Sequence, residues 1–290
     1  MRDLFLLDRD VCFLNHGSYG ATPEPVLAEY QRWQRELERQ PVEFLGRRLD
    51  GLLAEARAPL AAFVGARPED TAFVANATTG VNVVARSLRL EPGDEVLSTD
   101  LEYGACDLTW EHWCERAGAR YVRQPLDLAD PVGSLFAAAT ERTRVVYVSH
   151  ITSTTALVLP AAEICAEARR RGLLSVVDGA HAPAQVPLDV GGVGSTEPHH
   201  ERGAGSAGAP REAAVGADLY TGNCHKWLCA PKGCGFVWAR PDHHHWLESP
   251  IVSWGWADDG GDFVRRVEKQ GTQQPAAYLA APAAVAFVEE

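Results

Sequence analysis

The 290-residue sequence lacks several features that would assign it to common classes of protein. It has no uninterrupted apolar run of about 20 residues, so no transmembrane helix is expected. Its first ten residues are charged and lack a signal-peptide core, and its seven scattered cysteines form no evident disulfide framework. A reduced, cytoplasmic protein is therefore the simplest interpretation.

Basic charge is also scarce, because 27 basic residues face 39 acidic ones and the net charge is −12. A general nucleic-acid-binding protein needs a basic surface to neutralise phosphates, so we expect no nucleic-acid partner. No Gly-x-Ser-x-Gly elbow is present, which leaves a hydrolase without support. No Gly-x-Gly-x-x-Gly motif follows the first predicted strand, which argues against a nicotinamide cofactor.

The chain does contain an alternation of short apolar runs and amphipathic stretches. The apolar runs predict strands at 71–75, 95–99, 119–124, 144–150, 173–178, 217–222 and 235–240. The amphipathic stretches predict helices at about 79–89, 103–117 and 160–171. Because such alternation produces right-handed crossovers, we predict an α/β fold with a mostly parallel sheet flanked by helices. Ligands of such sheets bind at the carboxyl ends of the strands.

Three other segments depart from this alternation. Residues 25–64 have helical spacing of apolar residues, which Pro41 interrupts. Residues 191–214 are rich in Gly, Ala, Ser and charge, and are predicted to be a flexible surface insertion. Residues 276–290 are predicted to be a single helix that is still in progress where the chain ends.

The segment GNCHKWLCAPKGCGF (222–236) places Lys226 between a strand and a Gly/Pro-rich turn. Lysine forms imines with carbonyl cofactors, and partial burial lowers its pKa for that role. On these residues alone, Lys226 and Lys232 are equally well explained as ordinary surface lysines.

A second segment, LLSVVDGAH (173–181), ends an apolar run with Asp178. A carboxylate at this position is costly unless it has a partner. The protonated pyridine nitrogen of pyridoxal phosphate (PLP) would be such a partner. The alternative is an aspartate that caps a helix or turn. His181 is either a contact of the phenolic oxygen of the ring or a hydrogen-bonded core histidine.

Two further segments follow predicted strands. In ANATTGVN (75–82), Thr78, Thr79 and Gly80 would offer hydroxyls and backbone N–H groups to a phosphate at a helix N-terminus, or would simply cap the helix. In DLEYGA (100–105), Tyr103 would either stack on a flat cofactor or belong to the core. Each motif is weak by itself, but together they predict one site.

Together these motifs resemble the class V aminotransferase family of PLP enzymes (fold type I), and especially its isopenicillin N epimerase-like branch. The resemblance rests on FLNHGSYGATP (13–23), ATTG (77–80), SHITSTTALVLP (149–160), VVDGAHAPAQ (176–185), HKWLCAPKGCGF (225–236) and EKQGTQQPAAYLA (268–280). It covers almost the whole chain outside residues 191–214. It implies the large domain of the fold-type-I PLP enzymes, pyridoxal 5′-phosphate as cofactor, an amino-acid substrate and a homodimer.

The resemblance also implies roles for individual residues. Lys226 matches the Schiff-base lysine and Asp178 the carboxylate on the pyridine nitrogen, with His181 as the third catalytic position. The other implied cofactor-binding positions are Thr78, Thr79, Tyr103, Ser153, Asn223, His225 and Thr272. Thr272 matches a residue that reaches the phosphate of the neighbouring subunit, and Asn15 and His16 match the substrate entrance.

Under this resemblance the chain divides into three parts. They are an N-terminal segment at the substrate entrance (1–24), a large PLP-binding domain (25–265) and the start of a C-terminal domain (266–290). Most of that small domain, which supplies an arginine for the substrate carboxylate, is expected to be missing, so Arg265 and Arg266 are the candidates for that role.

Two functional hypotheses follow. In the first, the protein acts at the Cα or the Cβ–S bond of an amino acid through Lys226, as an epimerase, C–S lyase or aminotransferase. In the second, it is a truncated, catalytically impaired relative that binds PLP or a partner without turnover.

A metal site is the remaining possibility, and it is not predicted. Cys224, Cys229 and Cys234 recur every five residues, whereas zinc sites use tighter cysteine pairs, so packing beside the cofactor is preferred. The tract of three histidines at 243–245 is predicted to be a solvated loop.

Overall fold

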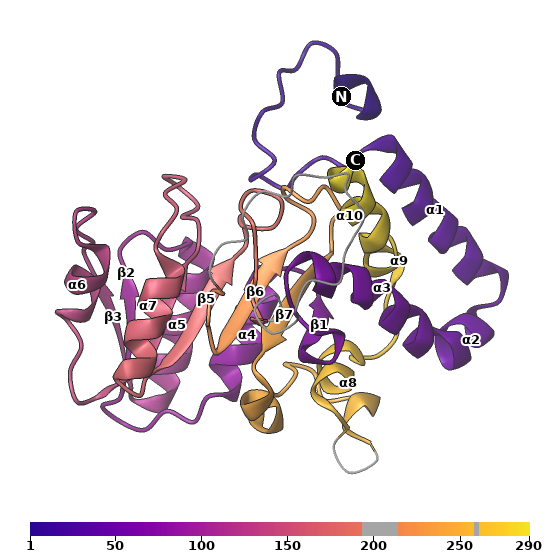
Figure 1. Ribbon diagram of the computed structural model, residues 1–290. Helices are drawn as coiled ribbons and strands as arrows, with labels where there is room; N and C mark the ends of the chain where they lie inside the picture. The colour runs from indigo at the N-terminus through magenta and orange to yellow at the C-terminus, as the bar shows by residue number, and fades with distance from the viewer. Residues whose placement is uncertain (193–213, 258–260) are drawn as a thin grey trace, which may run out of the picture.

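A seven-stranded sheet forms the centre of the protein in the computed structural model, which describes residues 1–192, 214–257 and 261–290 (Figure 1). The strand order is β1-β7-β6-β5-β4-β2-β3. The strands are β1 (Thr71–Val74), β2 (Glu95–Thr99), β3 (Arg120–Gln124), β4 (Thr143–Ser149), β5 (Leu174–Gly179), β6 (Leu219–Asn223) and β7 (Gly235–Ala239).

Strands β3, β2, β4, β5 and β6 pair in parallel, whereas β7 runs antiparallel to its neighbours β6 and β1. The prediction of a mostly parallel sheet is therefore confirmed. The central strands are buried because both faces of the sheet are covered, which explains their continuous apolar runs. The edge strand β3 is only partly buried.

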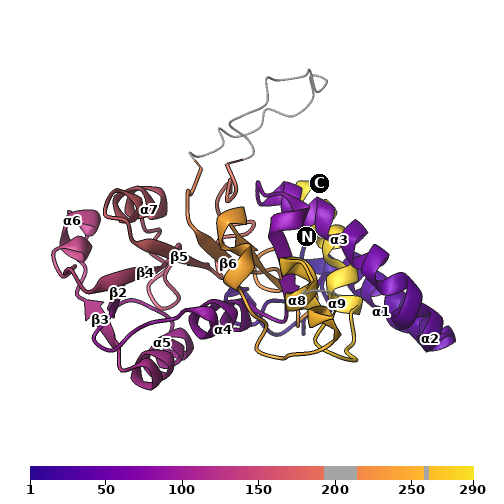
Figure 2. The ribbon, with the colours of Figure 1, turned by 90° about the horizontal axis from the view of Figure 1, so that it is seen from below.

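Helices lie on both faces of the sheet (Figure 2). They are α1 (Glu24–Arg39), α2 (Pro41–Glu43), the π-helical η2 (Phe44–Arg48), α3 (Leu49–Phe63), α4 (Ala77–Ser87), α5 (Gly104–Ala117), α6 (Pro131–Phe136), α7 (Ala161–Arg170), α8 (Phe263–Glu268), α9 (Ala276–Leu279) and α10 (Ala281–Glu289). Short 3₁₀ turns are η1 (Arg2–Leu4), η3 (Pro68–Asp70), η5 (Pro241–Trp246) and η6 (Trp254–Trp256). None of the helices in the described residues is both long and apolar enough to span a bilayer.

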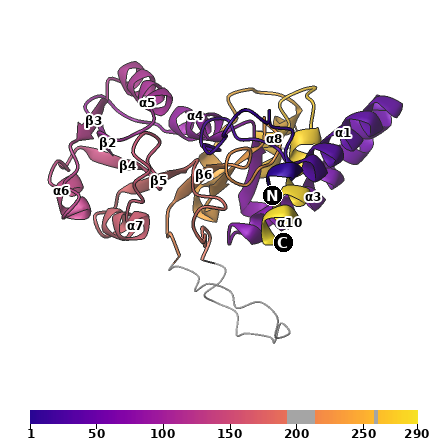
Figure 3. The same cartoon turned by 90° about the horizontal axis from the view of Figure 1, so that it is seen from above.

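The two faces of the sheet have separate cores. One core contains residues of α1, α3, α7 and α10, for example Leu60 and Ile164. The other contains residues of α4, α5 and α8, for example Val81, Trp110 and Phe263. Helix α10 packs against α1 and α3, so segments from both ends of the sequence share one layer (Figure 3).

Two predictions of local structure were wrong. Residues 276–290 form two helices, because the chain breaks at Ala280 and Pro282 then occupies the first turn of α10, where its missing N–H costs nothing. The histidine tract forms η5 instead of a solvated loop, since His244 stacks on Phe263 and hydrogen-bonds the carbonyl of Ala239. The predicted insertion at 191–214 lies almost entirely outside the described residues.

Candidate active site

The carboxyl ends of β2, β4, β5 and β6 meet at one edge of the sheet, because these strands are parallel. Asp178 is the penultimate residue of β5, Lys226 follows β6, and Tyr103 follows β2 as the N-cap of α5. The structure therefore brings together three residues that lie far apart in the sequence.

Asp178 is a buried carboxylate with three protein donors. Its Oδ1 accepts the N–H of Ala180 at 2.8 Å, and its Oδ2 accepts the hydroxyl of Tyr147 at 3.2 Å and the thiol of Cys106 at 3.5 Å. Burial raises the pKa of Asp178, while these donors and the charge of Lys226 act in the opposite direction. Because a carboxylate has about four acceptor positions, one position on Oδ1 is left for a further donor.

Lys226 lies in a hydrogen-bonded chain with His181 and Trp227. The distance between Lys226 Nζ and His181 Nε2 is 2.9 Å, and Trp227 Nε1 lies 3.2 Å from His181 Nδ1. Burial lowers the pKa of Lys226, which the charge of Asp178 only partly offsets. Burial, with the charge of Lys226, lowers the pKa of His181 to about 4, so this imidazole is neutral at neutral pH.

The hydrogen-bonding capacity of Trp227, His181 and Lys226 determines which nitrogen of His181 carries the proton. An indole N–H only donates, so Nδ1 of His181 must accept from Trp227 and carry no proton. In a neutral imidazole the proton is then on Nε2, which donates to Nζ of Lys226. An amine that accepts a hydrogen bond is uncharged, so this arrangement favours the nucleophilic form of Lys226.

Tyr103 borders the same space. The distance from Lys226 Nζ to the centroid of its ring is 5.9 Å, and the residue is 46% exposed. Of the two interpretations offered by the sequence, membership of the core is therefore wrong. The exposed ring is available to stack on a flat ligand next to Lys226.

The N-terminus of α4 faces this site from the end of β1. Asn76 caps the helix by accepting the N–H of Thr79, and Asn223 at the end of β6 accepts the N–H of Ala77, both at 2.8 Å. Asn223 therefore holds the helix end against the strand that leads to Lys226. The first-turn N–H groups and the helix dipole make this end suitable for a phosphate near Thr78.

The N-terminal segment closes the site on another side. A Cβ on Gly17 would lie 2.9 Å from Cε1 of His181, so the backbone next to His16 approaches the imidazole closely. His16 lies 3.5 Å from Sγ of Cys229, and Asn15 is exposed and hydrogen-bonds Ser18. This placement is compatible with the predicted substrate entrance.

Two other predicted residues flank the site. Ser153 is half-buried in the loop after β4. Nδ1 of His225 lies 2.9 Å from the carbonyl of Cys234, which fixes the imidazole next to Lys226. Their roles toward a cofactor stay predictions.

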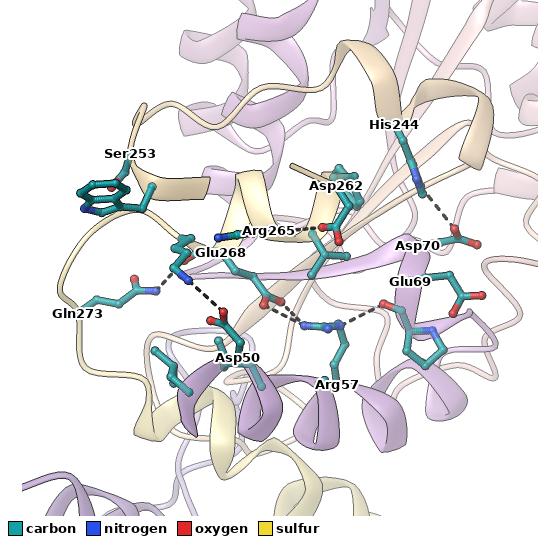
Figure 4. Close-up of a pocket in the computed structure, with 18 of the residues that line it drawn as sticks. Asp50, Arg57, Glu69, Asp70, His244, Ser253, Asp262, Arg265, Glu268 and Gln273 are labelled. Carbon is teal, nitrogen blue, oxygen red and sulfur yellow. Dashed lines mark hydrogen bonds and ion pairs between the residues drawn. The ribbon is translucent and has the colours of Figure 1, made fainter. Parts of the chain in front are cut away.

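The structure does not bring Thr272, Arg265 or Arg266 to Lys226. Thr272 and Arg265 line a cavity of about 910 Å³ between α3 and α8, whose lining in the described chain includes none of the other predicted site residues (Figure 4). Arg266 is buried and donates to the carbonyls of Leu247 and Gly261 at 3.2 and 2.6 Å. Its guanidinium is therefore engaged in holding the chain around α8.

Sequence reasoning missed Tyr147, Cys106 and Trp227. Trp227 directly follows the candidate lysine, and its indole N–H could have been recognised as a donor to a nearby group. Tyr147 gave a weaker signal, as a polar-tipped residue in an otherwise apolar strand. Cys106 gave none, because the contact with Asp178 depends on how α5 packs against the sheet.

The cysteines near Lys226 have separate environments. Cys224 and Cys234 are buried next to each other, whereas Cys229 contacts His16. Among the residues that the structure describes, no three His, Cys, Asp or Glu side chains are grouped so that they could hold a metal ion.

The site as a whole fits pyridoxal phosphate. A lysine amine within hydrogen-bonding distance of His181, a buried carboxylate with one open acceptor position, a helix N-terminus and an exposed aromatic ring border the same space. These are the groups that would hold, in turn, its aldehyde carbon, pyridine nitrogen, phosphate and ring face.

Comparisons with known proteins show the family of the chain. The family described as Aminotransferase class-V matches residues 17–195. An isopenicillin N epimerase from Amycolatopsis lactamdurans is 39% identical over 99% of this chain and 71% of its own length. A putative L-cysteine desulfhydrase from Oryza sativa subsp. japonica is 31% identical over 96% of this chain and 57% of its own length. The solved structure of the cystine C–S lyase C-DES with cysteine persulfide superposes with a TM-score of 0.81 at 24% identity, over 97% of this chain and 72% of that chain.

Proposed function

Because the chain belongs to the class V aminotransferase family, we propose that it is a PLP-dependent enzyme that acts at the Cα of an amino acid, as an isopenicillin N epimerase does. The resemblance detected in the sequence is confirmed, and so is its cofactor, pyridoxal 5′-phosphate. The observation that carries the proposal is the contact of 2.9 Å between Lys226 Nζ and His181 Nε2. It favours an uncharged amine next to the buried Asp178.

When bound, pyridoxal 5′-phosphate supplies an electron sink that stabilises negative charge at the Cα of the amino acid. Asp178 would hold the protonated ring nitrogen through the open position on Oδ1. Tyr103 would lie against the ring face, and the first turn of α4 with Thr78 and Thr79 would hold the phosphate. The Nε2 proton of His181, which is directed toward Lys226 Nζ in the cofactor-free protein, would be donated to the phenolic oxygen when the cofactor is bound.

Lys226 has two tasks in this proposal. Its neutral amine would hold the cofactor covalently in the resting enzyme. Once the amino acid has taken that position, the free amine would remove the proton from Cα as a general base. Asn15 and His16 line the path by which the amino acid enters.

Cleavage of a Cβ–S bond is the second candidate reaction. It is favoured by the similarity to a putative L-cysteine desulfhydrase, which is 31% identical to this chain over 96% of its length. The same Cα proton is removed in both reactions, so the difference lies in the fate of the Cβ substituent.

The active form in this proposal is a homodimer. Thr272 is exposed and lines the cavity between α3 and α8, whose described lining does not include Lys226. A second copy would bring it to the phosphate of the neighbouring site. Seven free cysteines support the proposed location in a reducing cytoplasm.

The test is to load the protein with PLP and to incubate it in D₂O with a panel of amino acids. Loss of the Cα proton signal in NMR, with inversion of the centre, supports epimerisation. Release of sulfide from cysteine or cystine supports the lyase, and formation of an oxo acid supports the transaminase. A bound cofactor without any exchange at Cα contradicts the proposal and supports an impaired relative.

A pair of variants tests the role of Lys226. Lys226→Ala should abolish the covalent, borohydride-reducible link to the cofactor, whereas Lys232→Ala, in the same turn, should preserve it. A reducible link in Lys226→Ala protein would contradict the assignment.

A further inference from the structure

Two side chains that belong to none of the predicted motifs donate hydrogen bonds to the carboxylate of Asp178. Tyr147 in β4 and Cys106 in the first turn of α5 both reach Oδ2, at 3.2 and 3.5 Å. They come from a neighbouring strand and from the helix that covers this face of the sheet. Burial raises the pKa of both groups, so both are protonated and act as donors.

Packing leaves Tyr147 little freedom to move. Its side chain is completely buried, and its ring contacts that of Trp110 with centroids 5.4 Å apart. In the pairing of β4 with β5, Tyr147 lies opposite Val176 and Ser149 lies opposite Asp178. Side chains two residues apart in a strand share a face, so the hydroxyl is directed along the sheet toward the carboxylate.

We propose that Tyr147, assisted by Cys106, is a positioning residue that selects the oxygen of Asp178 facing the cofactor and holds the carboxylate ionised. The proposal rests on the proposed function, since Asp178 must pair with a cationic ring nitrogen. With both donors on Oδ2 and Ala180 on Oδ1, the single open position belongs to Oδ1.

Other titratable groups near Asp178 also influence its charge. Lys226 favours the ionised carboxylate only when its amine is charged, and Glu102, Tyr220 and Cys106 would oppose it only if they were ionised. Hydrogen bonds to an ionised group are about twice as strong as neutral ones. The hydroxyl of Tyr147 therefore stabilises the ionised form of Asp178 more than the protonated form.

The test is the affinity for PLP from about pH 5 to about pH 9, for the wild type and Tyr147→Phe. On the acid side Asp178 has to lose its proton when PLP binds, so the variant should bind roughly tenfold more weakly there. On the alkaline side Asp178 is already ionised before PLP binds, so the difference in PLP affinity between wild type and variant should disappear. Cys106→Ala should show the same pattern with a smaller loss, because a thiol is a weaker donor.

Tyr220→Phe is the matched control. Tyr220 is equally buried in the adjacent strand β6, but its hydroxyl bonds Nδ1 of His150 at 2.9 Å. This variant should bind PLP as the wild type does over the whole pH range. An equal loss at every pH in Tyr147→Phe would indicate a merely structural role and overturn the proposal, as would an unchanged profile.

A second measurement needs no cofactor and separates this proposal from the proposed function. In cofactor-free protein, the destabilisation caused by Tyr147→Phe in urea unfolding should increase as pH rises and Asp178 ionises. In an Asp178→Asn background that pH dependence should vanish. A pH-independent difference would overturn the proposal even if the wild type bound no PLP.

Discussion

The indole N–H of Trp227 lies 3.2 Å from Nδ1 of His181, and this contact determines which nitrogen of the imidazole carries the proton. The tautomer in turn makes Nε2 a donor toward Lys226 Nζ at 2.9 Å. Trp227, which follows Lys226 in the chain, therefore acts on Lys226 through His181, although 46 positions separate Trp227 from His181. A phenylalanine at position 227 would preserve the packing and remove the donor.

Trp227→Phe should raise the pKa of Lys226. Without the indole donor, His181 is free to carry its proton on Nδ1 and to accept at Nε2, which favours the charged ammonium of Lys226. Loss of one such bond corresponds to roughly one pH unit. The measurement is the pH dependence of the rate at which added PLP becomes covalently attached.

Trp254→Phe serves as the control, because Trp254 is 76% exposed and lies outside this chain of hydrogen bonds. Its rate profile should coincide with that of the wild type. If the profile of Trp227→Phe also coincides with it, the tautomer has no influence on Lys226.

Asp178→Asn should retain covalently bound PLP but slow exchange of the Cα proton by roughly 10²-fold or more. An amide is neutral and does not hold the ring nitrogen protonated, so the electron sink is weakened. Exchange rates in D₂O for the loaded variant provide the check. Asp107→Asn, whose carboxylate also accepts a tyrosine hydroxyl but lies outside the site, should exchange at the wild-type rate.

Glu102→Gln should remove part of the pH dependence of stability. Burial raises the pKa of Glu102 from its ordinary value of 4.5 to about 8, against the hydrogen bonds from Ser149 and Thr99. Because the folded pKa exceeds the unfolded one, its contribution to the free energy of unfolding is complete below the ordinary pKa and is lost as pH rises toward about 8. Urea unfolding of wild type and variant between these pH values measures the difference.

The exposed Glu141 gives the comparison for this experiment. Glu141→Gln should leave the pH dependence of the free energy of unfolding as in the wild type. A Glu102→Gln protein that loses stability with rising pH as steeply as the wild type would show that Glu102 is ionised in the folded state.

Arg57→Met should destabilise the fold by roughly 3–5 kcal/mol, because it leaves the buried carboxylate of Glu268 without its ion-pair partner. Arg57 Nη1 lies 2.8 Å from Glu268 Oε1, and the same oxygen accepts the N–H of Phe73 in β1 (Figure 4). The free energy of unfolding in urea checks this. A smaller loss in the Arg57→Met, Glu268→Gln double variant would identify the unpaired charge as the cause.

An exposed ion pair serves as the control for the destabilisation expected in Arg57→Met. Arg47 pairs with Glu43 on the surface, where its side chain is 75% exposed. Arg47→Met should change stability by less than about 0.5 kcal/mol. If both arginine substitutions changed the free energy of unfolding equally, burial of Glu268 would not be the cause of the destabilisation.

The sequence predicted the strands accurately because buried parallel strands are continuous apolar runs that end at turn residues. The strand predicted at 173–178, for example, is β5 (Leu174–Gly179). The sequence predicted local structure less well where tertiary packing, and not the local pattern of residues, decides the conformation. The helix expected over 276–290 is divided at Ala280, and η5 forms because His244 packs on Phe263.

The sequence by itself determined the family and the α/β fold, and it nominated the residues of the candidate site, since Lys226, Asp178 and Tyr103 lie in motifs that each follow a strand. Only the tertiary structure decided the contacts among them. Hydrogen bonds such as those of Trp227 with His181 and of Tyr147 with Asp178 depend on side-chain positions within a few tenths of an ångström. Such positions result from packing between strands and helices that are distant in the chain, which no local pattern of residues encodes.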